Sequence, residues 1–480
     1  MDENKDKASH HSHPRIYQPR RPEKTVLYKV FQEYLETWIT QTHEEGGYVP
    51  SHVEKDFRKY LECGLLCHGF ARARCTCGHE FLVAFSCKGH GICPSCNARR
   101  MVETAAHQVE HVFPRVPVRQ WVLSLPKRLR YFLYHNPKIT SKVLRIFLDE
   151  IRKQLVQHYQ TATEPENLVK IGGVSFIHRF GSSLNAHPHF HCVIIEGVFV
   201  KDSDSQITFH KLTTITQDDI QVVQNRVRLR VLKSFKHSGL LEDHDVENMK
   251  TWNGGGGFSV NGTARIHEND SEGLERLLRY CARPPFALER LKQQSDGSLV
   301  YQLNKPLANG QTQLKLTSLE LIDKLAALVP PPRIHRHRYY GVLAPNSPFR
   351  ASVTAMAGLP LDHGVIKIQI TDKNNEPVEQ EQEYKPKRPN RYLWAMLLAR
   401  IYNLFPLLCP ECGSQMQIIA VIQEKPIINK ILSSVGEATD PPLLTPARGP
   451  PGWDDYKQDE FSDENEQSIP DYEFNQCISW

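Results

Sequence analysis

Three histidines, His187, His189 and His191, recur at every second position of one short segment. The surrounding residues 170–199 predict a β-hairpin, because a β-branched and aromatic run is followed by a small polar turn at 181–185 and by a second apolar run. Alternate side chains of a strand point to the same face, so the three imidazoles would share one face. Imidazoles grouped in this way can bind a divalent transition-metal ion. The alternative is a histidine-rich strand face without a ligand, and the apolar neighbours of the histidines favour a lined cleft over it.

A tyrosine surrounded by arginines is the second candidate for chemistry. Residues 269–272 are typical of a helix N-cap, and Pro284 ends the helix that follows. Tyr280 lies in its last turn, among three basic residues that would bind phosphates and favour the phenolate: Arg276, Arg279 and Arg283. A neutral phenol is a weak nucleophile at neutral pH, so such activation is needed for attack on phosphorus. The alternative role of this tyrosine is packing.

Cysteines supply a third candidate site. Cys75 and Cys77 form one close pair and Cys93 and Cys96 another, with a strand-like run at 81–85 between them. Two such pairs joined by a hairpin are typical of a structural zinc ribbon, in which four ligands close a tetrahedral site. Which of Cys75, Cys77, His79 and Cys87 complete the site is left open by the spacing.

Other cysteines fit this zinc ribbon less well. Cys63 and Cys67 are expected to be packed thiols. Cys409 and Cys412 form a single pair, which either completes a site with distant ligands or binds no metal.

Basic residues interleaved with aromatic residues suggest contacts with single-stranded nucleic acid, which is bound through backbone phosphates and base stacking. Residues 118–134 predict a strand and then a helix begun at Pro126, with Lys127, Arg128 and Arg130 at its first turn and tyrosines and a phenylalanine after them. The aromatic residues could equally be core. Arg336 and Arg338 lie in a second basic and aromatic run, 335–340.

Composition limits the possible classes. A chain of 480 residues is too long for one ordinary core, so several domains are expected. Its composition, 40% hydrophobic and 24% charged, is typical of globular proteins. No apolar run reaches the length of a membrane helix. The first residues lack the apolar region of a secretory signal, so we expect a cytoplasmic protein with reduced cysteines. Residues 97–154 carry twelve Lys and Arg against four Asp and Glu, whereas 454–480 carry nine acids and one lysine. A basic middle suits a protein that meets a polyanion, although two ordinary solvated faces would give the same counts.

The motifs together resemble those of a known family. Asn185, the His189-Phe190-His191 triplet and the run 196–199 are similar to the HUH (His-apolar-His) signature of single-strand DNA endonucleases. More narrowly they resemble the rolling-circle transposases of the insertion sequence ninety-one family. The likeness extends over most of 25–452, including the FSCKG, CPSC and ARRM motifs near the N-terminus, RYCARPPFALERL around Tyr280, and HRHRYYGVLAPN from His335.

The resemblance implies an α+β fold, with an HUH-type antiparallel sheet flanked by helices and an N-terminal helical and zinc-ribbon domain. It implies a Mg or Mn ion at His189 and His191, with His187, Glu196 or a more distant residue as third ligand, and zinc at the N-terminal cysteines. Tyr280 would attack DNA and be left as a 5′-phosphotyrosine. Members of the family often carry a second tyrosine four residues away, where this chain has Arg276 and Pro284.

The expected partner is DNA, as single-stranded element ends and target, in a bacterial cytoplasm at the nucleoid. A plasmid relaxase or replication initiator with the same chemistry is one alternative, and a non-catalytic zinc-ribbon DNA-binding protein is another. The predicted organisation is a basic tail (1–22), a helical and zinc-binding domain (23–115), the catalytic domain (116–352), an extension and linker (353–391), a C-terminal helical segment (392–450) and an acidic tail (451–480).

Overall fold

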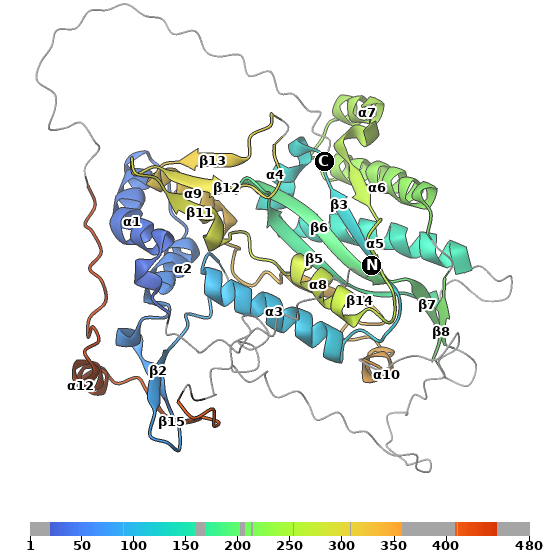
Figure 1. Cartoon of the computed structure of the whole chain (residues 1–480). Helices are drawn as coiled ribbons and strands as arrows, with labels where there is room; N and C mark the ends of the chain where they lie inside the picture. The colour runs from blue at the N-terminus through green and yellow to red at the C-terminus, as the bar shows by residue number, and fades with distance from the viewer. Residues whose placement is uncertain are drawn as a thin grey trace, which may run out of the picture.

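The computed structural model describes residues 20–89, 91–159, 169–201, 207–212, 215–252, 254–307, 309–357, 409 and 411–448. The acidic tail, the polar linker after residue 370 and the helix predicted before Cys409 lie outside these residues. The described part has a helical end next to an antiparallel sheet flanked by helices (Figure 1). This arrangement confirms the predicted α+β class. No described helix is long and apolar enough to cross a membrane.

The central sheet holds the histidine hairpin in its middle. All its strand pairs are antiparallel, with the order β10-β3-β6-β5-β14 and β9 also paired to β3. The predicted hairpin is confirmed by the bounds of its strands. The second basic run ends in β14 and begins two residues before it. The strands are β3 (Val118–Ser124), β5 (Gly172–Phe180), β6 (Ala186–Ile195), β9 (Ser259–Asn261), β10 (Arg265–Ile266) and β14 (His337–Gly341).

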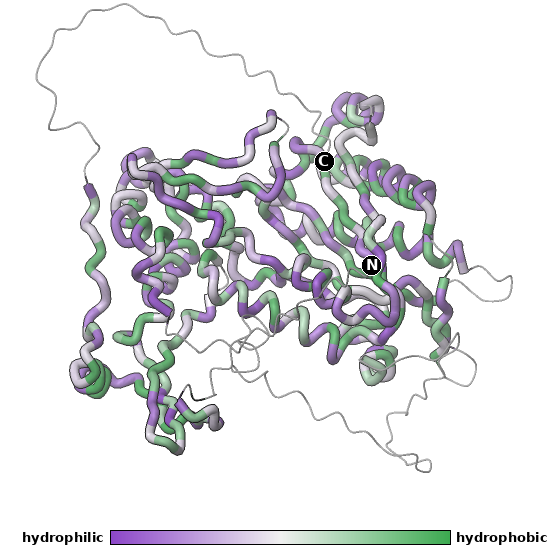
Figure 2. The backbone as a smooth tube through the Cα atoms, viewed as in Figure 1, coloured by the Kyte–Doolittle hydropathy of each residue, from purple (hydrophilic) through white to green (hydrophobic). Residues whose placement is uncertain are grey.

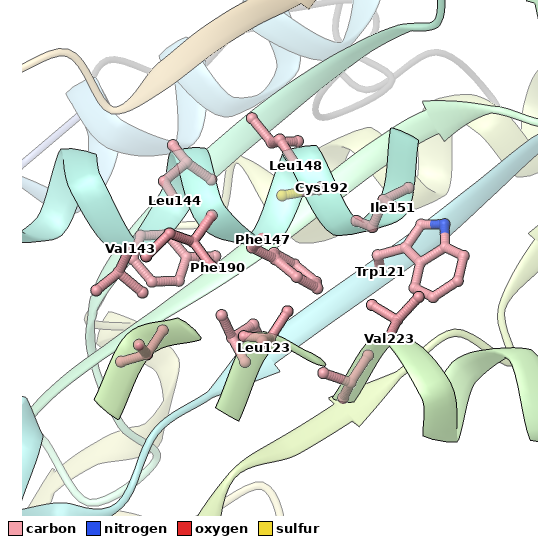
Figure 3. Close-up of a cluster of buried hydrophobic side chains, with 14 of the residues drawn as sticks. Trp121, Leu123, Val143, Leu144, Phe147, Leu148, Ile151, Phe190, Cys192 and Val223 are labelled. Carbon is pink, nitrogen blue, oxygen red and sulfur yellow. The ribbon is translucent and has the colours of Figure 1, made fainter. Parts of the chain in front are cut away.

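One face of this sheet is covered by two long amphipathic helices. Apolar and polar residues alternate along them (Figure 2), and the apolar ones meet β3 and β6 in a large buried cluster (Figure 3). Phe190, Cys192 and Ile194 of β6 point into this cluster. The two long helices are α5 (Pro137–Tyr159) and α6 (Gln217–His237). Next to them lie α4 (Lys127–His135), α7 (Asp243–Thr251) and the turn η4 (Gly254–Gly257).

The opposite face carries the odd-numbered residues of β6, which include the histidines. Val193 and Ile195 pack there against α8 (Ser271–Cys281), which also contacts α3 (Pro94–His111). The side chain of Asp270 accepts a hydrogen bond from the Gly273 amide, which confirms the predicted N-cap of α8. The faces differ because the pleat sends successive side chains to opposite sides. Helix α8 therefore crosses the histidine face.

Smaller elements complete the molecule. Helices α1 (Val26–Glu44) and α2 (Ser51–Glu62) share one buried core with the sheet β11-β12-β13 and with α9. The N-terminal helices therefore pack against elements that lie within the predicted catalytic domain (116–352). The remaining bounds are η1 (Pro22–Lys24), η2 (Leu66–His68), β1 (Phe70–Arg74), β2 (Glu80–Ala84), β4 (Val169–Lys170), β7 (Gly197–Lys201), β8 (Ile207–Lys211), η5 (Leu288–Arg290), β11 (Leu291–Gln293), β12 (Leu299–Gln302), β13 (Gln313–Leu316), α9 (Ser318–Leu328), α10 (Arg350–Ala355), β15 (Gln417–Ile422) and α12 (Lys425–Val435).

Candidate active site and metal centres

Three buried histidines from the two strands of the hairpin form one group. His178 of β5 lies directly opposite His189 of β6, and His191 follows two residues later on the same face. One ring nitrogen of each lies within 4.8 Å of the others. Three imidazoles at this spacing can hold one divalent cation.

Hydrogen bonds to backbone carbonyl oxygens orient the rings of His178 and His189. The Nε2–H of His178 donates to the carbonyl oxygen of Cys281 in α8 at 2.6 Å. The Nδ1–H of His189 donates to the carbonyl of His187 at 2.8 Å. A metal-binding histidine typically donates its other N–H in this way, which fixes the tautomer. His178 therefore presents Nδ1, and His189 presents Nε2, as a lone pair.

His191 contacts Gln120 of β3 through Nδ1, at 2.9 Å from the side-chain amide. The two ends of a glutamine amide are assigned from hydrogen bonding. If Oε1 faces His191, it accepts from Nδ1–H and also from the Cys281 thiol, which lies 3.3 Å from the same amide atom. Burial raises the pKa of Cys281 to about 12, so this thiol keeps its proton. In that orientation His191 presents Nε2 as a lone pair.

Two ring nitrogens in the group are buried and have no hydrogen-bond partner among the described residues: His178 Nδ1 and His191 Nε2. A buried polar atom without a partner is costly, so these atoms fit a bound cation. Burial lowers the pKa of His189 to about 4 and that of His191 to about 2, and it lowers the pKa of His178 as well. The rings are therefore neutral at physiological pH, as metal ligation requires.

The expected third ligand, His187, lies on this face but outside the group. Its Nε2 shares a hydrogen bond of 3.1 Å with the Ser124 hydroxyl. Glu196, the other candidate, is buried at the far end of β6, where it pairs with Arg119 at 2.6 Å and with Arg265. The third imidazole of the group, beside those of His189 and His191, is that of His178. The turn at 181–185 alone would place Pro188 opposite His178, and a bulge between His178 and Phe180 shifts the register by one residue so that His178 faces His189. The position of the turn was therefore not enough to identify His178 from the sequence.

Tyr280 lies next to the histidine group. The residue is 48% exposed, and its ring centroid is 5.5 Å from that of His191 in an edge-on arrangement. The nucleophile expected from the sequence and the expected cation ligands thus meet at one place, although they come from different elements. The packing of α8 on the histidine face brings them together.

Only one of the three arginines near Tyr280 faces it. Arg276 lies close to Glu272 and Asp270, and Arg279 pairs with Glu275 at 2.6 Å. The Arg283 guanidinium lies over the Tyr280 ring, 4.7 Å from its centroid, and near the Phe180 ring. No carboxylate among the described residues pairs with Arg283. Its charge is therefore available for a phosphate.

The first turn of α4 brings further positive charge. Arg130 donates to the Leu125 carbonyl at 2.7 Å. Burial lowers the pKa of His187 to about 3, and the charge of Arg130 contributes to this shift. Arg128 pairs with Asp245 at 2.7 Å, and Lys127 is exposed.

The aromatic residues of α4 divide between the core and solvent. Phe132 packs against the core around Phe235. Tyr131 is 64% exposed. Tyr131 is therefore available for base stacking, whereas Phe132 is a core residue.

The second basic run forms β14 and the residues before it. Arg336 donates to the Asn97 side chain at 2.9 Å, and burial lowers its pKa to about 10. Arg338 donates to the Ser141 hydroxyl at 2.8 Å. Both guanidiniums thus have protein partners, and neither belongs to the group around Tyr280.

The cysteines divide into two groups of four. The sequence had placed Cys75 and Cys77 with Cys93 and Cys96, and had left Cys409 and Cys412 either with distant ligands or without a metal. The first group comprises Cys63, Cys87, Cys93 and Cys96, with Sγ atoms 3.5–3.7 Å apart along three of its pairs and all within 4.8 Å. A tetrahedral zinc with Zn–S bonds of about 2.3 Å sets its sulfurs roughly 3.8 Å apart, so this donor set fits zinc. Cys63 belongs to it and is not merely a packed thiol. Cys75 and Cys77 lie instead with Cys409 and Cys412.

Comparisons with known proteins match two segments of the chain. A family model described as "Putative transposase" matches residues 172–350, and one described as "Transposase zinc-binding domain" matches residues 30–125. The first segment contains the histidine group and Tyr280, and the second contains the first cysteine group.

Two curated proteins are similar over much of their length. The transposase for insertion sequence element IS801 of Pseudomonas savastanoi pv. phaseolicola is 23% identical over 389 residues, which cover 79% of this chain and 86% of that protein. The putative transposase y4qJ of Sinorhizobium fredii (strain NBRC 101917 / NGR234) is 24% identical over 293 residues, which cover 57% of this chain and 70% of that protein. No solved structure matches.

A zinc-binding N-terminal region followed by a transposase domain defines the class, that of the DNA transposases. Within it, the chain is similar to the transposases of the insertion sequence ninety-one family, through the zinc-binding segment and the IS801 relative.

Proposed function

We propose that this transposase cleaves and rejoins single-stranded DNA at the ends of its insertion sequence, with Tyr280 as the nucleophile. The observation that carries the proposal is the contact between the Tyr280 ring and His191, one of three grouped and buried imidazoles. Two of these imidazoles have a ring nitrogen without a hydrogen-bond partner among the described residues. A nucleophile beside a cation site is the arrangement that metal-assisted phosphoryl transfer requires.

His178, His189 and His191 would hold the cation, which we propose to be Mg²⁺ or Mn²⁺. Such an ion, when bound, supplies charge stabilisation at the scissile phosphate. Imidazole ligands favour Mn²⁺ over Mg²⁺, which prefers oxygen ligands.

In the chemical step, the Tyr280 oxygen forms a bond to phosphorus and the bond from phosphorus to the 3′ oxygen breaks. The phenolic proton is lost and the leaving oxygen gains one, which gives a 5′-phosphotyrosine and a free 3′-hydroxyl. Arg283, over the Tyr280 ring, is positioned to offset the developing negative charge. One phosphodiester is exchanged for another, so a 3′-hydroxyl can reverse the step at a target without ATP.

We propose that the strand passes over α4 towards Tyr280. Arg130 and Lys127 would contact its phosphates, and the exposed ring of Tyr131 would stack on a base. The activity would take place in the bacterial cytoplasm, on DNA of the nucleoid.

A single tyrosine supports one covalent link per chain at a time. Arg276 and Pro284 occupy the positions four residues before and after Tyr280, so α8 offers no second phenol at helical spacing. We therefore propose a sequential rolling-circle or peel-and-paste route, in which one end is cleaved and transferred before another link forms.

Zinc at Cys63, Cys87, Cys93 and Cys96 completes the proposal. These cysteines lie in the matched zinc-binding segment, and the group joins the end of α2 to the start of α3. A closed tetrathiolate site of this kind is structural, because it leaves no open coordination position.

The test is a denaturing gel of the protein with single-stranded DNA that carries the element's ends, in Mn²⁺ or Mg²⁺. We expect a protein–DNA adduct that falls below about 0.1% of the wild-type yield in Tyr280→Phe and in His189→Ala. Tyr48→Phe is the matched control, because Tyr48 is 74% exposed and lies outside the site. An adduct that survives in Tyr280→Phe would reject this nucleophile. DNA binding without any adduct from the wild type would favour the non-catalytic binding protein.

A further inference from the structure

The second cysteine group is built from segments far apart in the chain. Cys75 and Cys77 follow β1 near the N-terminus, whereas Cys409 and Cys412 precede β15. The Sγ atoms of Cys75 and Cys412 are 3.4 Å apart, those of Cys77 and Cys409 are 3.5 Å apart, and all four lie within 4.8 Å. These separations are close to the roughly 3.8 Å between sulfurs in a tetrahedral zinc site.

Both cysteine pairs lie in tight turns that a glycine amide closes, three residues after Cys75 and four residues after Cys409. The Gly78 amide donates to the Cys75 carbonyl at 3.0 Å, and the Gly413 amide donates to the Cys409 carbonyl at 2.9 Å. Each glycine has a positive φ, 94° for Gly78 and 70° for Gly413, which other residues rarely adopt. The two turns thus present their thiols to each other, although the first pair is separated by one residue and the second by two.

The sheet around these cysteines has little hydrophobic core of its own. It consists of β15, β1 and β2, and its buried cluster contains Ala73, Met416 and two of the cysteines themselves, with Phe81 partly buried beside them. Ile418, Ile419 and Val421 of β15 remain exposed. A unit with so small a core needs another source of stability, such as a metal ion.

We propose that Cys75, Cys77, Cys409 and Cys412 form a second zinc site, distinct from the first group, which fastens the C-terminal strand β15 to β1 of the N-terminal region. Binding releases the thiol protons and leaves four thiolates on one Zn²⁺. Cys409 and Cys412 lie outside both segments matched by the family models. The site closes a loop of more than 300 residues, since 332 positions separate Cys77 from Cys409.

The two zinc sites differ in access to solvent. Cys77 and Cys412 are exposed, whereas no cysteine of the first group is. The second site is therefore expected to lose its metal first when a chelator is added. Its loss would free β15, while Ile428 and Leu432 would keep α12 packed in the main N-terminal core.

The experiment measures zinc per full-length chain together with amide exchange. We expect the variant Cys409→Ser, Cys412→Ser to contain one zinc fewer than the wild type and to lose protection of the β15 amides at 417–422. The matched control is Cys67→Ser, a buried cysteine outside both groups, which should keep the wild-type zinc content. Cys63→Ser should lose zinc from the first group and keep β15 protected.

Equal zinc content in the wild type and in the double variant would overturn the proposal. So would a Cys75–Cys412 or Cys77–Cys409 disulfide in protein purified without oxidant, detected by mapping of alkylated peptides. If the double variant fails to fold, chelator titration of the wild type decides. Release of one zinc, with loss of protection confined to 417–422 and the adjoining β1, supports the site. Release without any change in β15 rejects it.

Discussion

Each imidazole at the candidate active site uses one ring nitrogen for a protein partner and turns the other towards its neighbours. The partners are the Cys281 carbonyl for His178, the His187 carbonyl for His189 and the Gln120 amide for His191. Two of these partners are backbone atoms, which a side-chain substitution does not remove. The orientation of the rings therefore depends on the hairpin and on α8 more than on other side chains.

At this scale, we predict that His178→Ala weakens Mn²⁺ binding by more than tenfold, because it removes a ligand nitrogen. His187→Ala should change the affinity by less than tenfold, because the group orienting His189 is the backbone carbonyl of residue 187. Titration followed by the electron paramagnetic resonance signal of free Mn²⁺ measures both. A larger loss in His187→Ala than in His178→Ala would make His187 the ligand.

The buried histidines also predict a pH dependence. An imidazole of ordinary pKa, about 6.5, is mostly protonated at pH 5.5, and protonation at that pH would cost about tenfold in metal affinity per ligand. Burial lowers the pKa of His189 to about 4 and that of His191 to about 2, so both remain neutral at pH 5.5. We therefore expect Mn²⁺ affinity to change little between pH 7.5 and 5.5 and to fall only as the pH approaches 4. A steep loss just below pH 6.5 would contradict this expectation.

At the scale of the elements, a buried carboxylate ties three strands of the sheet together. Glu196, at the end of β6, accepts from Arg119 of β3 at 2.6 Å and 3.1 Å and also pairs with Arg265 of β10. Arg119 is nearly as buried as Glu196 and also donates to the Gly262 carbonyl. This network sets the positions of the strands on one side of the histidines without contacting them.

We predict that Glu196→Gln lowers the free energy of unfolding by roughly 3 kcal/mol, because it leaves two guanidiniums without their carboxylate in a buried setting. Mn²⁺ affinity should remain at the wild-type value, since Glu196 lies outside the histidine group. Urea unfolding and Mn²⁺ titration of the same protein test the two parts. A large loss of Mn²⁺ affinity with normal stability would make Glu196 a ligand.

At the scale of the whole molecule, the N-terminal helices depend on chain that follows the active site. Helix α1 packs against α9, and Leu325 of α9 is completely buried in the core that they share. The chain thus leaves the N-terminal core after α3, builds the central sheet and α8, and returns. The zinc-binding region and the catalytic region are joined by this return as well as by their direct connection.

We predict that Leu325→Ala lowers the free energy of unfolding by roughly 2–4 kcal/mol, through lost burial and the cavity left behind. Because the core is shared, amide exchange should also increase in α1, almost three hundred residues away in the sequence. Leu229→Ala is the control, because Leu229 is 53% exposed on α6 and should change stability by less than about 0.5 kcal/mol. Unchanged exchange in α1 would show that the two parts unfold independently.

The sequence by itself determined the local elements and much of the candidate chemistry. The spacing of apolar residues and the turn residues predicted the hairpin and the strand and helix over 118–134, because periodicity and turn residues act over a few positions. The histidine face and Tyr280 followed from the same periodicities and from the family resemblance, and the predicted cysteine pairs do lie in close groups.

Only the tertiary structure decided which residues meet. His178 joins His189 through strand register, and Cys63 comes close to Cys93 and Cys96 where Asp56 of α2 accepts hydrogen bonds from the Gly91 and Ile92 amides just before α3. Cys75 and Cys77 meet partners more than 300 residues away. Arg336, expected at a DNA surface, instead packs against Asn97. Such long-range pairings depend on how the apolar faces of distant elements are buried together, and no local pattern in the chain encodes that outcome.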